Sequence, residues 1–245
     1  VVLLTLSALI IIGGLGFLVW ENIVQKRSFG KFSVYARMVL LMTAALLAVG
    51  WAGTCLLEWN NPETLGGMTV GEKLLNGFFQ SATLRTAGFA AIDQAKLTES
   101  GKAFSCVLMS IGGSSGSTAG GIKTVTFLVL ALTIWARARG KSTVCAFKRT
   151  IPDEQTQNAM IIAFIVLALA VFGGIFISAT SPMSFTDAVY EAVSALATVG
   201  LSAGGTASLS IPAQILIIIY MYFGRVGVLT ISLGFLAGDR AEERF

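Results

Sequence analysis

A glycine- and serine-rich run, Gly112–Gly121, lies inside a long apolar stretch and limits what this chain can fold into more than any other feature. Five of its ten residues are glycine, and its flanks, 103–109 and 125–135, are largely apolar. Each interior glycine costs a helix about 1 kcal/mol relative to alanine, so a straight helix is disfavoured. In lipid, irregular backbone survives only where protein buries it or a water-filled cavity wets it. The run therefore predicts a broken membrane helix whose break faces an internal pathway.

The composition is that of a polytopic membrane protein. Of the 245 residues, 55% are hydrophobic and 12% are charged, whereas about a quarter of a soluble domain is charged. The chain has no histidine, which excludes imidazole acid–base chemistry and histidine-ligated metals. The three cysteines, Cys55, Cys106 and Cys145, lack metal-ligand spacing and are interpreted as small apolar side chains. The chain begins inside an apolar run without Met, so we expect it to start within a helix of a longer protein.

Apolar segments of two lengths alternate along the chain. A helix needs about 20 apolar residues to cross a bilayer, because each residue adds about 1.5 Å. Segments long enough to cross lie at 1–20, 38–57, 158–180 and 212–236, and the broken one lies at 103–135. Two others, 74–84 and 183–197, are too short to cross and suit re-entrant helices, which enter the membrane and turn back.

The distribution of lysine and arginine predicts the orientation in the membrane. These residues concentrate in the loops around 26–37 and 137–149, whereas the loops around 58–73, 90–102 and 202–211 are not basic. The positive-inside rule places the basic loops and the charged tail in the cytoplasm. Both short helices then enter from outside, which gives a pattern of span, re-entrant helix and span that occurs twice.

A Thr-x-Gly tripeptide follows each short segment, at 86–88 and at 198–200, which are 112 positions apart. At the same offset Met109 matches Met221, and Gly112 matches Gly224. Two matched patterns at one offset, with agreeing topology, favour an internal duplication. The opening segment carries Ile-Gly-Gly at 12–14, as the broken segment does at 111–113, so we expect two complete units and the end of a third.

A Thr-x-Gly turn at the end of a re-entrant helix is suited to selecting cations. The carboxyl end of a helix is partly negative and attracts them. Glycine permits the unusual dihedral angles that turn carbonyl groups inward, and carbonyl oxygens that replace a hydration shell select K⁺ in channels. A single tripeptide of this kind is more simply a plain turn, but two at equivalent positions favour a selectivity filter.

With these motifs the chain resembles the Trk/Ktr/HKT superfamily of K⁺-translocating (in some members Na⁺-translocating) membrane subunits. Three stretches carry the resemblance, which covers the whole chain: 78–89 (FFQSATLRTAGF), 110–123 (SIGGSSGSTAGGIK) and 222–227 (YFGRVG). Such subunits are transporters and not enzymes, and they place four repeats of span, pore helix and span around one pore. The resemblance implies an all-α polytopic protein of the plasma (inner) membrane that takes up K⁺ as its transported ion.

The resemblance also divides the chain into segments. Residues 1–25 are expected to be the second membrane helix of a preceding repeat, followed by a cytoplasmic loop at 26–37. Residues 38–136 are expected to form a repeat with a pore loop and a broken second helix. The remaining segments are a basic cytoplasmic loop (137–157), the final repeat with its pore loop (158–237) and a cytoplasmic tail (238–245).

Functional residues follow from the resemblance, position by position. The ion selectivity filter falls on Thr86, Ala87, Gly88 and Phe89, and on Thr198, Val199, Gly200 and Leu201, whose carbonyl groups would bind K⁺. The gate falls on the intramembrane loop of Gly112, Gly113, Ser114, Ser115, Gly116, Ser117, Thr118, Ala119, Gly120 and Gly121, together with Lys123 and Arg225. Hydroxyl groups in this loop are available to ions or to freed backbone groups.

Two basic residues lie at membrane depth in this scheme. Arg225 is near the middle of the last span, where inserting an arginine costs roughly 2.5–3.5 kcal/mol, so we expect it to be buried. It either satisfies carbonyl groups at a helix contact or, as the resemblance implies, opposes cations under the filter and pins the gate loop. Lys123 follows the break and either faces the cavity or reaches toward the cytoplasm.

No cofactor is expected on this chain. By resemblance the subunit contacts membrane lipid, forms a homodimer and binds a cytoplasmic regulatory subunit of the RCK type. The resemblance places the regulatory nucleotide on that partner, and no nucleic acid partner is expected.

Other functions compete with K⁺ uptake. A Na⁺-conducting member of the same family, or one that couples K⁺ to Na⁺ or H⁺, fits the same motifs. A secondary transporter with discontinuous helices is disfavoured, because such folds use inverted repeats and the repeats here run parallel. A purely structural membrane subunit leaves the two matched tripeptides unexplained.

Three local patterns have simpler explanations. Residues 116–124 (GSTAGGIKT) nearly match a phosphate-binding loop, but Ile122 separates the glycine from the lysine and no strand precedes them. Asp187 and Glu191 could form a proton relay, yet an acid in the first turn of a helix is favourable by itself. The basic cluster at 137–149 could bind anionic lipid or an acidic partner, but its role as a topology signal explains it.

Overall fold

The computed structural model describes the chain except for residues 27, 118, 142, 148 and 227–245. The expected tail, 238–245, lies outside the described residues. The α-helices are α1 (Val2–Leu15), α2 (Phe17–Lys26), α3 (Val34–Glu58), α4 (Val70–Thr83), α5 (Glu99–Ser110), α6 (Thr124–Ala138), α7 (Asp153–Thr180), α8 (Phe185–Leu196) and α9 (Ile211–Val226). Shorter elements are the 3₁₀ helices η1 (Phe29–Lys31), η2 (Gln94–Lys96) and η3 (Thr206–Ser208) and the strands β1 (Cys145–Ala146) and β2 (Arg149–Thr150).

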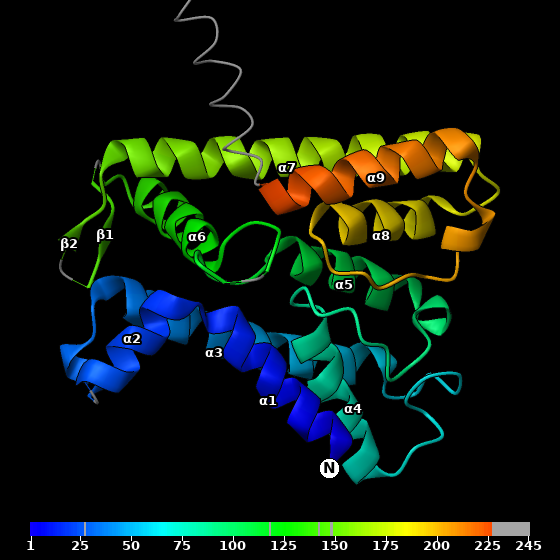
Figure 1. Cartoon of the computed structure of the whole chain (residues 1–245), viewed down its shortest axis with the longest axis horizontal. Helices are drawn as coiled ribbons and strands as arrows, with labels where there is room; N and C mark the ends of the chain where they lie inside the picture. The colour runs from blue at the N-terminus through cyan, green and yellow to red at the C-terminus, as the bar shows by residue number, and fades with distance from the viewer. Residues whose placement is uncertain (27, 118, 142, 148, 227–245) are drawn as a thin grey trace, which may run out of the picture.

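The helices form two groups (Figure 1). In one group α8 packs against both α7 and α9, and in the other α4 packs against α3 and α1. Helix α5 lies between them and contacts α8 on one side and α3 on the other. The short helix α8 is the centre of the core, because every residue from 190 to 197 is buried.

Glycines on α7 allow this close packing. A β-carbon on Gly173 would lie 2.7 Å from the Tyr220 ring of α9 and 2.9 Å from the Ala192 side chain of α8. In lipid there is little hydrophobic drive between apolar helices, so small residues that let backbones approach supply much of the packing energy.

Two helices within the described residues, α3 and α7, are long and apolar enough to cross a membrane. The pair α1 and α2 counts as a third span if it is taken together, although it bends by 94° at its break. Both long helices begin earlier than the hydrophobicity predicts, by four or five residues. The side chain of Ser33 caps α3 by accepting from the Ala36 N–H, and Pro152 precedes α7, whose first turn is acidic.

The two segments expected to be re-entrant form helices that are too short to cross a membrane. Helix α4 has 14 residues and α8 has 12, or about 21 and 18 Å, against a hydrocarbon core of about 30 Å. Helix α4 starts at Val70 and not near Leu74, because Thr69 and Glu72 form a capping box. Ser184, the residue directly before α8, caps that helix, because its side chain accepts from the Asp187 N–H.

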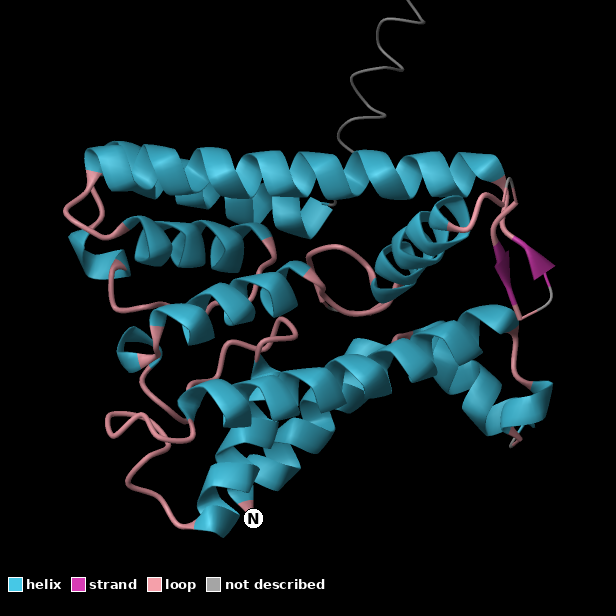
Figure 2. Cartoon of the chain, turned by 180° about the vertical axis from the view of Figure 1, so that it is seen from behind, coloured by secondary structure: helices cyan, strands magenta, loops and turns pink. Residues whose placement is uncertain are grey.

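The expected break in the long segment is present. Helix α5 ends at Ser110 and α6 begins at Thr124, with the glycine-rich run between them. Both views show this run as a loop between the ends of the two helices (Figures 1 and 2).

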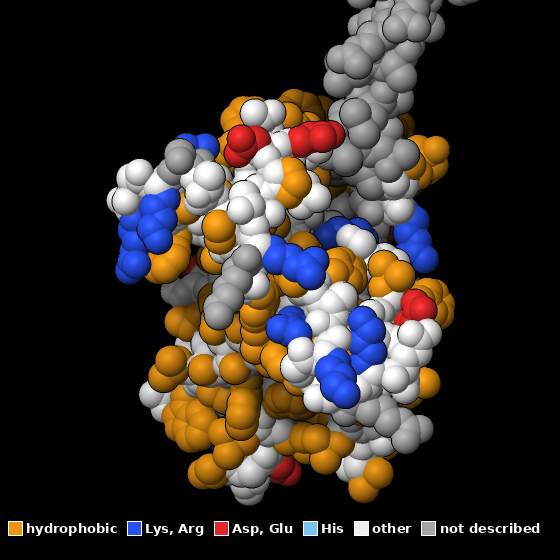
Figure 3. Space-filling view, turned by 90° about the vertical axis from the view of Figure 1, so that its left-hand side faces the viewer, with side chains coloured by type: hydrophobic (Ala, Val, Ile, Leu, Met, Phe, Trp, Pro, Cys, Tyr) orange, Lys and Arg blue, Asp and Glu red, His pale blue; other side chains and the backbone are white. Residues whose placement is uncertain are grey.

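A small hairpin lies in the basic loop, where no strand was expected. Residues Cys145 and Ala146 pair antiparallel with Thr150 and Arg149. Lysine and arginine side chains gather on the face of the molecule that Figure 3 shows. Among the described residues of the two basic loops, the exposed basic ones are Lys26, Lys31, Arg137, Arg139, Lys141 and Arg149.

Candidate ion filter and gate

The turn after α4 has an unusual backbone. Thr86 has a φ of 62° and Gly88 a φ of 77°. Positive φ is uncommon for residues other than glycine and strained for a β-branched one, so the surrounding structure must hold Thr86 in place. The turn after α8 has the same pair of angles at the equivalent positions, with φ 53° at Thr198 and 91° at Gly200. The two tripeptides matched in the sequence therefore adopt the same backbone form.

A side-chain hydroxyl near the carboxyl end of each short helix forms hydrogen bonds with the Thr-x-Gly turn that follows the helix. Thr83 accepts from the Phe89 N–H at 2.8 Å and donates to the Phe89 carbonyl at 2.7 Å. Ser194 accepts from the Gly200 N–H at 3.2 Å and donates to the Leu201 carbonyl at 2.6 Å. The anchoring hydroxyl lies three residues before Thr86 but four before Thr198, so the offset of 112 does not extend unchanged into the short helices.

The two turns meet each other. A β-carbon on Gly88 would collide with the carbonyl oxygen of Val199 and would lie 3.4 Å from the α-carbon of Gly200. Only glycine permits this approach, because any side chain would fill the space that the Val199 carbonyl occupies. Carbonyl groups of one turn thus lie directly beside the backbone of the other.

The glycine-rich loop is closed at its neck by backbone hydrogen bonds. The Gly112 N–H donates to the Ile122 carbonyl at 2.9 Å, and the Ile122 N–H donates to the Ser110 carbonyl at 3.0 Å. Within the loop, Gly120 touches the second turn, since a β-carbon there would collide with the Thr198 hydroxyl oxygen and lie 2.8 Å from the Ala197 carbonyl. The loop thus packs directly against the end of α8, where the second turn begins.

Ser114 attaches the same loop to the break between α1 and α2. It is fully buried; its N–H donates to the Gly14 carbonyl at 3.1 Å, and its hydroxyl donates to the Leu15 carbonyl. Helix α3 also contacts the loop, because the hydroxyl of Tyr35 donates to the Ser115 carbonyl at 2.9 Å. The two glycine-containing breaks that echo each other in the sequence are therefore in contact. Thr118 lies outside the described residues.

The two basic residues of the expected gate come together. Lys123 is half-buried and donates to the Ala119 carbonyl at 2.6 Å, which ties it to the loop. Arg225, in the last turn of α9, lies close enough to Lys123 for their positive charges to repel. We expected Arg225 to be buried in the membrane protein; in the part of the chain that the structure describes, its side chain is exposed and lines an open pocket.

That pocket has a volume of about 430 Å³ and extends from the second turn to Arg225. Its lining combines the second turn, the loop that follows it and α9. The lining residues that bear on the candidate filter and gate are Glu191, Thr198, Gly200, Ser202, Thr206 and Arg225.

Glu191 organises the loop after the second turn, a role that the sequence did not indicate. It is 5% exposed and accepts from the Ser202 hydroxyl at 2.5 Å, the Ala203 N–H at 3.0 Å and the Thr206 hydroxyl at 2.9 Å. The suggested relay with Asp187 is not supported, because Asp187 instead forms an ion pair with Lys102 at 2.7 Å. The feature of the sequence that could have indicated this role is an acidic residue directly after a tyrosine, inside a short helix that is otherwise mostly apolar.

No separate role was predicted for Arg85, the residue directly before Thr86. It is 8% exposed, and its guanidinium donates to the Thr43 hydroxyl of α3 at 3.5 Å. Its Nε has no hydrogen-bond partner among the described residues. A buried cation thus lies beside the first turn.

Comparison with known proteins identifies the relatives of this arrangement. Residues 1–242 match a family model described as "TrkH: Cation transport protein". The chain is 38% identical to the "Potassium/sodium uptake protein NtpJ" of Enterococcus hirae over 99% of this chain and 55% of the relative. It is 39% identical to the "Ktr system potassium uptake protein B" of Vibrio alginolyticus over 93% of this chain and 50% of the relative. The chain therefore spans about half the length of the curated relatives that it matches.

A solved structure shares the fold. The crystal structure of the potassium transporter TrkH from Vibrio parahaemolyticus superposes with a TM-score of 0.73, over 94% of this chain and 51% of that chain. At 19% sequence identity this likeness concerns the fold alone.

Proposed function

Since the chain belongs to the TrkH family of cation transport proteins, which are membrane transporters and not enzymes, we propose that it forms half of the ion pathway of a K⁺ uptake subunit in the plasma membrane. The observation that carries this proposal is the contact between the two turns. The Val199 carbonyl lies beside Gly88, at the point where both short helices end. Two further turns of the same form, from the half of the protein outside this chain, would complete a ring of carbonyl groups around one pore.

The electrostatics of the turns fit cation selection. Helices α4 and α8 both end at the turns, and the partly negative carboxyl ends of helices stabilise a cation placed there. Residues Thr86 to Phe89 and Thr198 to Leu201 provide the carbonyl oxygens that replace the hydration shell of K⁺. The positive φ angles at Thr86 and Thr198 turn these carbonyl groups away from helical directions.

The glycine-rich loop is suited to act as the gate. It packs against Thr198 through Gly120, and it is held from the other side by Ser114. Lys123 and Arg225, whose positive charges lie close enough to repel each other, would oppose a cation that has passed the filter. Moving the loop from Thr198 would open the path below the filter.

The remaining parts of the assembly are proposals from the family. The subunit would form a homodimer and bind an RCK-type regulatory subunit on the cytoplasmic side, and the nucleotide would bind to that partner. The exposed basic residues of the loops around 26–37 and 137–149 mark that side.

A Na⁺-conducting or Na⁺/K⁺-coupled activity is the second candidate, because one relative is named a potassium/sodium uptake protein. A secondary transporter with inverted repeats is less well supported. The loops that follow the two turns touch each other, since a β-carbon on Gly204 would lie 3.3 Å from the Ala95 side chain, and this is expected when both turns face the same side of the membrane.

The test is ⁸⁶Rb⁺ uptake by the full-length protein in cells that lack K⁺ uptake, with K⁺ and Na⁺ as separate competitors. Uptake that K⁺ blocks and Na⁺ does not, and that Arg225→Ala alters, supports a gated K⁺ pathway. Equal block by both ions favours the second candidate. Absence of uptake by protein present in the membrane would overturn the proposal, as would cysteine labelling that puts Ala90 and Ala203 on opposite faces.

A further inference from the structure

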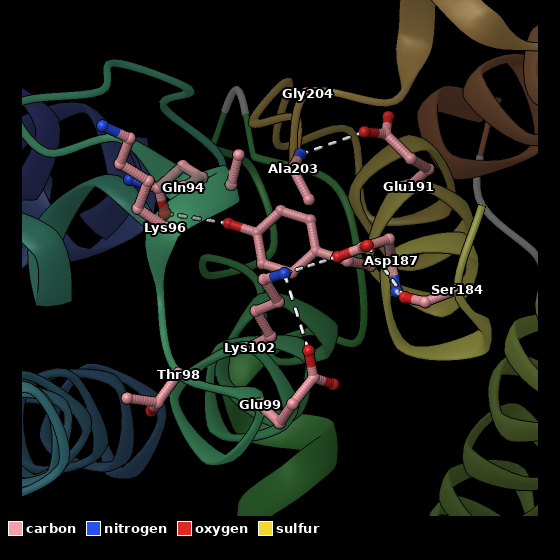
Figure 4. A network of polar contacts seen from close by, with 12 residues as sticks. Gln94, Lys96, Thr98, Glu99, Lys102, Ser184, Asp187, Glu191, Ala203 and Gly204 are labelled. Carbon is pink, nitrogen blue, oxygen red and sulfur yellow. Dashed lines mark hydrogen bonds and ion pairs between the residues drawn. The ribbon is translucent and has the colours of Figure 1, made fainter. Parts of the chain in front are cut away.

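A buried tyrosine of α8 reaches from the final repeat into the preceding one. Tyr190 is fully buried, and its hydroxyl donates to the side-chain oxygen of Gln94 at 2.9 Å. The two residues are 96 positions apart, and Gln94 belongs to η2, in the loop after the first turn. Figure 4 shows Gln94 extending toward the centre of this network, with Glu191 and Asp187 on the other side.

Gln94 is also hydrogen-bonded to the other short helix, α4. Its side-chain oxygen also accepts from Gln80 of α4 at 2.6 Å, and its amide donates back to Gln80 at 3.2 Å and to the Ile92 carbonyl at 2.7 Å. Gln80 is 1% exposed and Gln94 is 2% exposed. Buried polar groups with complete hydrogen bonding hold one arrangement, because breaking any bond leaves a partner unsatisfied.

The network lies one helical turn behind both anchoring hydroxyls. Gln80 precedes Thr83 by three residues on α4, and Tyr190 precedes Ser194 by four residues on α8. These spacings are those of neighbours on one helix face. A shift of Tyr190 relative to Gln80 therefore moves the two filter turns relative to each other.

A second link joins the same two repeats one turn further out. Lys102 of α5 forms an ion pair with Asp187 of α8 at 2.7 Å (Figure 4). Asp187 also accepts from the Ser184 hydroxyl at 2.8 Å, which fixes its carboxylate. Two cross-links between the repeats thus lie behind the turns, one inside the protein and one near its outer end.

We propose that the Gln80–Gln94–Tyr190 network is a positioning element that sets the spacing between the two filter turns and so determines the preference for K⁺ over Na⁺. The inference rests on the proposed function, since it assumes that the turns select the ion. Selection by carbonyl groups depends on where the oxygens lie and how rigidly they are held, so a small displacement changes the preference. The network acts through the turns and does not touch the ion.

The test is Tyr190→Phe in the full-length protein, with Tyr220→Phe as the matched control. Tyr220 is equally buried, and its hydroxyl donates to the Leu169 carbonyl at 2.7 Å, so the control loses one comparable hydrogen bond away from the turns. The readout is the ratio of the Na⁺ and K⁺ concentrations that halve ⁸⁶Rb⁺ uptake. We expect Tyr190→Phe to lower this ratio roughly three- to tenfold, the effect of about one hydrogen bond, and Tyr220→Phe to leave it unchanged.

Gln80→Met removes the other end of the network and is expected to lower the ratio in the same way, which keeps the test available if Tyr190→Phe does not reach the membrane. An unchanged ratio in both variants, with normal wild-type uptake, would overturn this inference alone. An equal shift in Tyr220→Phe would do the same, since it would point to a general loss of packing. Absence of wild-type uptake would overturn the proposed function and this inference with it.

Discussion

The hydroxyl oxygen of Thr198 lies against Gly120, so that the turn after α8 and the glycine-rich loop are in direct contact. No side chain larger than hydrogen fits at Gly120 without moving one of them. The contact provides a short physical route by which a change in the loop reaches the turn.

Gly120→Ala is expected to weaken the closed arrangement of the loop. Overpacking a tight contact costs about 1–3 kcal/mol, which corresponds to roughly a 5- to 150-fold change in the equilibrium between two loop positions. We expect higher ⁸⁶Rb⁺ uptake at equal amounts of protein in the membrane. Gly71→Ala is the control, because nothing lies within 4 Å of a β-carbon there. Unchanged or lower uptake by Gly120→Ala would contradict a closing role for the contact.

Thr83→Val and Ser194→Ala are each expected to disorder one filter turn. Each change removes a hydroxyl that pairs with both an N–H and a carbonyl group of its turn, and each buried group left unpaired costs about 1–3 kcal/mol. Uptake and discrimination between K⁺ and Na⁺ should both fall.

Thr133→Val is the matched control for these variants. Thr133 is buried in α6, and its hydroxyl donates to the Val129 carbonyl of its own helix. It should leave ion discrimination intact. If it reduces discrimination as much as Thr83→Val does, the anchoring role of Thr83 is wrong.

Glu58→Gln is expected to destabilise the outer end of α3 without a direct effect on selectivity. Glu58 is 1% exposed and accepts from Asn61, from Thr64 and from both the N–H and the hydroxyl of Thr98. A glutamine places an amide donor opposite one of these donors, at a cost of about 1–3 kcal/mol. Thermal unfolding of the purified protein in detergent should show a lower Tm. The exposed Glu99→Gln serves as the control, and an equal Tm for both variants counts against this account.

Lys102→Met, Asp187→Asn and the double variant test the ion pair between α5 and α8. Because the Lys102 side chain is 7% exposed and that of Asp187 is 24% exposed, we expect a coupling free energy of roughly 0.5–3 kcal/mol from the double-mutant cycle. Chemical denaturation of the three variants and the wild type gives this number. Strict additivity of the two single changes would show that the pair contributes nothing to stability.

The sequence predicted the elements whose causes are local. The glycine-rich break between α5 and α6 and the two helices too short to cross follow from glycine content and segment length, and the structure contains them. The early start of α4 at Val70 was also readable, because Thr69 and Glu72 have the spacing of a capping box. The 3.6-residue period and backbone propensities act within one segment, so the order of residues is enough to predict them.

Only the tertiary structure decided which distant groups meet. The Val199 carbonyl beside Gly88, Ser114 on the Leu15 carbonyl and Tyr190 on Gln94 join residues far apart in the chain. Burial was also decided there: Arg225, expected to be buried, is exposed in the described part of the chain, and Glu191, considered only as part of a proton relay, is buried and accepts three hydrogen bonds. The physical reason is that such contacts depend on how whole helices pack, through steric fit and paired polar groups, and no local pattern in the sequence encodes that geometry.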